Sequence, residues 1–234
     1  SSLTVATLTI QADAGSNTTG SATVVGNLTA SGAVTLTAAD TAVATLELQG
    51  TTISAGSFVL NDVTGLATLT VSSANGAVGF TGTIDGAAGG DGTLTVTDPD
   101  CAGGDLVTFN SAVGTTRLLA INVGSTALAG NAKFTGLASA VTITIAGGSN
   151  SSEAGAAEFQ AAVTGNIVLD KNTGGATATI NAANGAQTLT GTVIGLSAGD
   201  GTLAIIDDDA GVAPNEITFS GAIGGTRLGA ITVG

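Results

Sequence analysis

The chain has 234 residues, with 17 acidic against 4 basic side chains, a formal net charge of −13, and no histidine, methionine, tryptophan or tyrosine. Binding a nucleic-acid backbone needs clustered Lys and Arg, which this charge balance excludes. Without histidine the chain cannot form a Ser–His or Cys–His nucleophile or a histidine-based metal site, and no run approaches the roughly 18 consecutive apolar residues of a membrane helix. We therefore expect a protein that is not an enzyme, binds no nucleic acid and does not insert into a membrane.

Short segments in which apolar residues alternate with threonine recur along the whole chain. In chain order they are 3–10, 33–37, 44–48, 67–71, 92–97, 106–109, 140–145, 167–169, 176–180, 201–206 and 217–219. Alternation with a period of two is typical of half-buried β-strands. Gly, Asn, Asp and Ser separate the segments and supply the backbone conformations that turns need. The pattern predicts an all-β protein.

A longer repeat is superimposed on these strands. Residues 74–94 match 183–203 at 13 of 21 positions, with an offset of 109 residues. Residues 107–124 match 217–234 at 11 of 18 positions, with an offset of 110. The preceding parts of the two units match only loosely.

Two architectures agree with this pattern. A right-handed β-solenoid winds short strands into coils that pack only against their neighbours, which suits small and β-branched side chains. Two tandem β-sandwich or jelly-roll domains are the alternative, but a sandwich fills its thicker core with large residues, and the only aromatics here are six Phe. We predict the solenoid, with residues 1–124 as a first β-repeat unit and 125–234 as a second.

The segments 108–114 and 218–224 are each followed by Thr-Arg-Leu and Ala-Ile-x-Val-Gly. They resemble the β-strand repeats of large bacterial filamentous-haemagglutinin-type adhesins and autotransporter passengers. Those proteins form long right-handed β-helices that project from the cell and mediate adhesion or coat its surface. The resemblance implies an extracellular or cell-surface location and transfers no catalytic or ligand-binding residue. The scarcity of Lys and Cys likewise points to a secreted bacterial or archaeal protein.

Acidic residues crowd equivalent loops of the two units. Calcium takes about six to eight hard oxygens from carboxylates and loop carbonyls, and acidic Gly-rich loops supply both. The spacing is not that of an EF-hand, and the alternative is a solvated acidic turn that keeps the protein soluble. The candidate calcium ligands are Asp91, Asp98, Asp100 and Asp105 in the first unit, and Asp200, Asp207, Asp208, Asp209 and Glu216 in the second.

The first functional hypothesis is a structural subunit of an extracellular filament, sheath or surface layer that assembles with copies of itself. An apolar N-terminal strand containing Leu3, Val5, Leu8 and Ile10 can complete the sheet of another copy by strand addition, and open solenoid ends favour head-to-tail growth. The alternative is a repeat segment of an adhesin that binds a host or cell-surface ligand as a stable monomer. An ice-binding solenoid is a third hypothesis, but Thr-x-Thr runs such as 142–144 show no fixed period in the sequence.

Arg117 and Arg227 hold equivalent positions and are half of the 4 cations. We expect them to serve assembly by pairing with acidic loops of the same or a neighbouring subunit. The alternative is a weak surface ion pair, worth about 0–1 kcal/mol.

Other features leave alternatives open. The lone Cys101 cannot form an internal disulfide, so it is an exposed thiol, a buried one or an intermolecular partner. Asn17, Asn27 and Asn150 begin N-glycosylation sequons, which arise readily by chance in a chain rich in Asn and Thr. Because the sequence starts without Met or an apolar signal, we expect a processed mature chain or a fragment.

Overall fold

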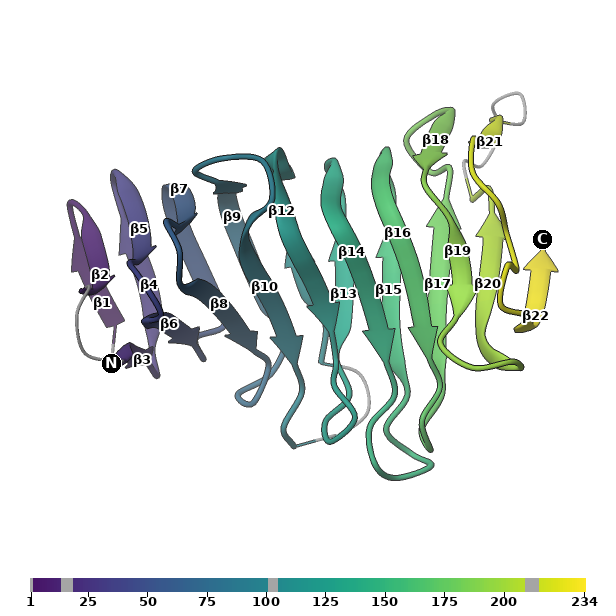
Figure 1. Cartoon of the computed structure of the whole chain (residues 1–234), viewed down its shortest axis with the longest axis horizontal. Coiled ribbons are helices and arrows are strands. Elements are labelled where there is room, and N and C mark those ends of the chain that lie inside the picture. The colour runs from purple at the N-terminus through teal and green to yellow at the C-terminus, as the bar shows by residue number, and fades with distance from the viewer. Residues whose placement is uncertain (1, 14–18, 101–104, 209–214) are drawn as a thin grey trace.

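The computed structural model describes residues 2–13, 19–100, 105–208 and 215–234. Every regular element in these ranges is a β-strand, and all paired strands are parallel. The strands wind into a β-solenoid of about nine turns, with the two ends of the chain at opposite ends of its long axis (Figure 1). The predicted solenoid is therefore confirmed, and the tandem-sandwich alternative is wrong, because sandwiches are built from antiparallel sheets.

Each coil contributes one strand segment to each of three faces, and the strands within each face run parallel. We name the faces A, B and C in chain order. Face A consists of β1 (Ser2–Val5), β4 (Asn27–Ala30), the first parts of β7 (Thr52–Asp62) and β9 (Val78–Gly86), β11 (Val107–Phe109), β13 (Asn131–Phe134), β15 (Gly155–Phe159), β17 (Ala176–Asn181), β20 (Asp200–Ile206) and β22 (Leu228–Val233). Face B consists of β2 (Leu8–Ala12), β5 (Ala33–Ala38), the second parts of β7 and β9, the first parts of β12 (Val113–Val123), β14 (Ala138–Ala146) and β16 (Val163–Asp170), and then β18 (Gln187–Thr190) and β21 (Ile217–Phe219). Face C consists of β3 (Thr19–Val24), β6 (Val43–Leu48), β8 (Leu66–Ser72), β10 (Asp91–Thr97), the second parts of β12, β14 and β16, and β19 (Val193–Gly195), followed by a bridge at Ile223.

Apolar residues of similar kind stack above one another inside the solenoid. On face A the inward column runs from coil to coil through Leu3, Leu28, Ile53, Phe80, Phe109, Phe134, Phe159, Ile180, Ile205 and Val233. From Leu28 to Ile180 every member is at most 1% exposed. In-register parallel pairing satisfies the backbone of each coil on its neighbours, so the core grows by one thin layer per coil.

Phenylalanine rings form a continuous stack through the middle of this core. Phe58, Phe80, Phe109, Phe134 and Phe159 follow one another with ring centroids 4.7, 5.2, 4.9 and 5.2 Å apart. The last two contacts are nearly coplanar, with interplanar angles of 8°. Such pairs add about 0.5–1.5 kcal/mol each beyond the burial of their area. Four of these Phe belong to the face A column, and Phe58 reaches the same ring stack from face B.

The segment 3–10, predicted as one strand, is instead two strands on two faces, β1 and β2. Ala6 and Thr7 form the corner between them, and the N–H of Gly32 in the next coil donates to the carbonyl of Ala6 at 2.8 Å. The alternation changes phase at this corner, since the inward residues are Leu3 and Val5 before it and Leu8 and Ile10 after it. This change of phase is the sign of the bend in the sequence.

The repeat in the sequence is also a repeat of backbone conformation. Equivalent glycines share a left-handed φ of similar size: Gly76 and Gly185 (108° and 109°), Gly90 and Gly199 (97° and 96°), Gly92 and Gly201 (77° and 67°), and Gly114 and Gly224 (82° and 78°). At Gly92 an added Cβ would lie 2.2 Å from the Cβ of Leu60, and at Gly201 it would lie 2.3 Å from that of Leu169. Only glycine combines this φ with so close an approach.

The two units nevertheless occupy different faces. On face C, Leu94 is followed four coils later by Val193. The repeat equivalent of Leu94 is Leu203, which lies one strand segment further along, on face A. An offset of 109 residues therefore equals four coils plus one face. The core is continuous across Gly124, and the division of the chain there stays a prediction from the sequence.

Replacing Phe134 by Ala should lower the free energy of unfolding by about 3–5 kcal/mol, because the substitution removes a buried ring that stacks on two neighbours. Phe219→Ala is the matched control and should cost clearly less, since Phe219 is only half-buried in the last complete coil. Urea unfolding followed by circular dichroism measures both losses. Equal losses would show that the aromatic stack is not a principal source of stability.

Candidate functional site

The acidic corner after β10 brings three of the predicted calcium ligands together. Asp98 directly follows β10, is 1% exposed, and donates its backbone N–H to the carbonyl of Ala129 at 2.8 Å. Asp100 is exposed, and Asp105 is half-buried on the other side of the corner, shortly before β11. One carboxylate oxygen of each residue lies within 4.8 Å of those of the other two.

This spacing fits a calcium ion. Calcium binds oxygen at about 2.3–2.6 Å, so two oxygens on one ion stand at most about 5 Å apart. The three carboxylates would supply three of about six to eight ligands, and a divalent cation would relieve the repulsion between their charges. An exposed acidic turn has a similar composition, so calcium at this corner stays a prediction.

The carboxylates of the equivalent loop in the second unit bind separate donors. Asp207 accepts from the backbone N–H of Asn215 at 2.9 Å, Asp208 from the side-chain amide of Asn181 at 3.0 Å, and Glu216 from the hydroxyl of Thr218 at 3.0 Å. Among the described residues no second group of three carboxylates gathers within reach of one ion. Asp209 lies outside the described residues.

Asp91 and Asp200 hold turns. Asp91 accepts a hydrogen bond from the backbone N–H of Ala88 at 3.1 Å, and Asp200 accepts the equivalent bond from Ser197 at 2.8 Å. Aspartates that bond their own turn are common for this local reason. The repetition of this acid in both units is therefore explained by the turn, without a metal.

Arg117 and Arg227 lie at equivalent exposed corners. The backbone carbonyl of each accepts a hydrogen bond from a glycine of the preceding turn, Gly90 at 2.7 Å and Gly199 at 2.8 Å. The backbone at both arginines thus anchors the turns held by the two aspartates. A role of the guanidinium groups in assembly stays a prediction.

Sequence reasoning missed a polar network on face A. Glu158 accepts hydrogen bonds from the side chains of Gln160 at 2.7 Å and Asn181 at 2.8 Å, and Lys133 forms an ion pair with it at 3.6 Å. Asn181 also donates to Asp208. These residues come together because coils stack, and no local motif in the sequence marks them. Their contacts tie neighbouring coils together along face A, where Gln160 and Asn181 are only 8% and 1% exposed.

Threonine pairs also stack on face C, although the sequence shows no fixed period. Thr68 and Thr70 of β8 lie beside Thr93 and Thr95 of β10. The next coil interrupts the array, which resumes one coil later with 142–144. The residues that interrupt the two columns are Glu47 before β8, Ala120 and Asn122 in β12, and Asn166 and Val168 in β16. The regular surface expected of an ice-binding solenoid is therefore present only in short pieces.

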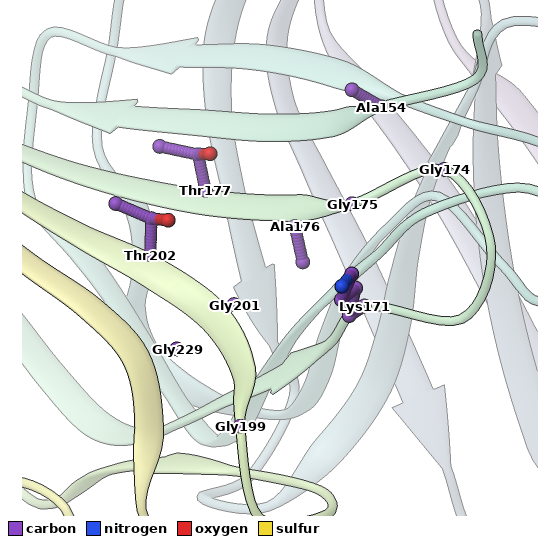
Figure 2. A pocket seen from close by; sticks show the side chains of 10 residues that line it. All are labelled: Ala154, Lys171, Gly174, Gly175, Ala176, Thr177, Gly199, Gly201, Thr202 and Gly229. Carbon is purple, nitrogen blue, oxygen red and sulfur yellow. The ribbon is translucent and has the colours of Figure 1, made fainter. Parts of the chain in front are cut away.

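A shallow hollow of about 280 Å³ lies beside strands β17 and β20, and Figure 2 shows the residues that line it. Lys171 is at its edge, and the hydroxyls of Thr177 and Thr202 project from neighbouring strands. Glycine and alanine form the rest of the lining, so the hollow exists because side chains are small there. Its lining contains no carboxylate, and it offers no acid–base pair for catalysis.

The predicted assembly residues Leu3, Val5, Leu8 and Ile10 line the inside of the first coil. All four are partly buried and pack against the core. Their partners in the next coil are at most 4% exposed, so the first coil exposes the end of the core. The structure thus places these four side chains at one open end of the solenoid.

Two asparagines of the predicted sequons make hydrogen bonds within the fold. The side-chain oxygen of Asn27 accepts from the N–H of Thr52 at 3.1 Å, and the side-chain amide of Asn150 donates to Glu153 at 2.6 Å. Asn17 and Cys101 lie outside the described residues.

Comparison of the chain with models of known protein families, with curated proteins and with solved structures found no significant match. None of the described residues belongs to a helix that is long and apolar enough to cross a membrane.

We predict that Ca²⁺ raises the melting temperature of the protein through the corner at Asp98, Asp100 and Asp105. At about 100 times its Kd, a ligand of the folded state adds ~2.7 kcal/mol of stability. The double variant Asp100→Asn/Asp105→Asn should lose this rise, whereas Asp91→Asn should keep it. Thermal unfolding with CaCl₂ and with a chelator measures the difference, and an unchanged rise in the double variant would place any bound calcium elsewhere.

Proposed function

We propose that this chain is a structural subunit of an extracellular filament, sheath or surface layer, and that it assembles head to tail through the ends of its solenoid. The observation that carries the proposal is the apolar core left open at both ends. The extracellular location is inferred from the resemblance of the repeats to surface adhesins and from the composition.

The N-terminal end presents the first layer of the core. Leu3 and Leu8 are partly buried, whereas Leu28 and Val34, which pair with them in the next coil, are 0% exposed. A further coil on this end would bury the first layer as completely as the second. Each large aliphatic side chain that becomes fully buried adds about 1.5–3 kcal/mol relative to full exposure.

The C-terminal end is more open. Val233 is 77% exposed and Ile231 is 53% exposed, although both point in the direction of the core column. Ile205, Ile217 and Phe219 below them are partly buried. Partly or largely exposed apolar side chains are therefore present on β20, β21 and β22 at this end.

The backbone of the end strands supports the same conclusion. Among the strands that the structure describes, β1 pairs only with β4 and β22 only with β20, so each has one free edge. Free edges are templates for further pairing unless charges, prolines or a covering segment block them. Within the described residues, no element covers either end. Solenoids that stay monomeric normally carry polar capping repeats.

The sides of the solenoid favour end-to-end over lateral contact. Outward strand positions carry mostly threonine, together with serine, asparagine, alanine and a few charged residues. The formal net charge of −13 makes copies repel one another. At the ends, apolar burial and strand pairing oppose this repulsion. Growth along the axis is therefore the association that the described surface favours.

Val233→Asp should prevent end-to-end association, because it places a charge in the layer that the next coil would bury. Val63→Asp is the matched control: Val63 is 58% exposed but lies between β7 and β8, away from both ends. Sedimentation velocity over a range of concentrations, with negative-stain microscopy, measures association. A wild-type chain that stays monomeric at high concentration would contradict the proposal and favour the monomeric adhesin segment.

A further inference from the structure

Each end of the solenoid is stepped, because its three faces do not end at the same height; we call such a stepped end a ramp. At the C-terminal end the chain passes through β20 on face A, β21 on face B and the bridge at Ile223 on face C, and it returns to face A with β22. Face A therefore carries one more strand than faces B and C. A step of one strand spacing, about 4.8 Å, separates β22 from β21.

A hollow of about 230 Å³ lies at this step. It is lined by the ends of β20 and β22 and the start of β21, with apolar side chains from Ile205, Ile217 and Val233. The hollow is thus the place where the next strand segment of the solenoid would begin.

The N-terminal end has the complementary ramp. Strand β1 on face A begins it, β2 on face B and β3 on face C follow, and β4 then covers β1. The two stepped ends fit together without a gap only when β1 of the second copy lies on the face where the next strand of the first copy would begin. That place lies on β21, beside the hollow, and belongs to face B.

We infer that a second copy docks with its β1 on β21 and its β3 on β22, so that each copy is turned by one face relative to the one before it. This inference rests on the head-to-tail assembly proposed above and adds its register. Without the turn, β1 would stand on β22, and β2 would face β21 across a gap one strand wide. With a turn of two faces, β2 would stand on β22, and the mismatch would remain.

The chain already contains the same rotation within itself. Its second unit repeats the first four coils and one face later, and Leu94 on face C and Leu203 on face A are both fully buried. The side chains of one face therefore fit the next face. In the inferred register Ala22 would stand over Ile231, and small apolar side chains would continue the column.

Three cysteine pairs distinguish the three registers. All contain Thr232→Cys in a Cys101→Ser background, combined with Thr23→Cys for a turn of one face, Ser2→Cys for no turn, or Thr9→Cys for a turn of two faces. These partner residues are outward and exposed, as is Thr232. In its own register each would lie directly opposite Thr232 on the neighbouring strand, about 4.8 Å away, which is within the Cα separation of about 4.4–6.8 Å that a disulfide allows.

Mild oxidation of the assembled protein should cross-link the Thr23→Cys pair at least tenfold more than the other two, with mass spectrometry identifying the joined peptides. If the protein assembles but the Ser2→Cys or Thr9→Cys pair cross-links best, the one-face register is wrong. If the protein assembles and no pair cross-links, the one-face register is likewise wrong. A disulfide between two copies of Thr232→Cys, or sedimentation that shows no assembly, would overturn the proposed function instead. The Thr232→Cys single variant provides the reference for self-linking.

Discussion

Axial pairing between coils is the constraint on which the rest of this structure depends. Every strand between the first and the last coil bonds to the strand one coil before and the strand one coil after, so side chains of similar size must stand above one another. The inward columns satisfy this with Leu, Ile, Val and Phe, and they are most regular in the middle coils, where Phe80, Phe109, Phe134 and Phe159 coincide. Because no layer is thicker than one coil, the core has no centre, and its weakest parts are its two ends.

The corners between strands hold the residues that do not fit the regular inward columns. The acidic corners, Pro99 and the variation in coil length all fall between strands. The acidic corner of the first unit connects face C to face A, whereas its counterpart in the second unit connects face A to face B. The two corners therefore lie at different edges of the solenoid, and the described residues around them differ even though their sequences are related. This explains why Asp98, Asp100 and Asp105 converge, while Asp207 and Asp208 bond to separate neighbours.

Much of the fold could be predicted from the sequence, because alternation with threonine marks strands such as β5, β6, β8 and β10 directly. Strands such as β13 and β15 were not predicted. β13 is only 4 residues long with one large apolar residue, and glycine and alanine fill the first 3 of the 5 positions of β15, so that alternation there has little contrast. Which strands pair could not be read from the sequence. Inward positions on face A are 21 residues apart at Phe159 and Ile180 but 29 apart at Phe80 and Phe109, so no single period gives the register. The acidic corner was found from composition, and only the fold separated its three converging acids from Asp91, which holds a turn.

Because the repeat units are offset by one face, the number of units determines the direction in which later corners point about the solenoid axis. Inserting or deleting one whole unit would leave every inward column filled with suitable side chains, yet it would turn all later corners by a third of a revolution about the axis. Only a change of three units would restore their original azimuth. In such a protein, duplication alters the direction in which surface loops point as well as the length of the rod, and it does so without any change to the loops themselves.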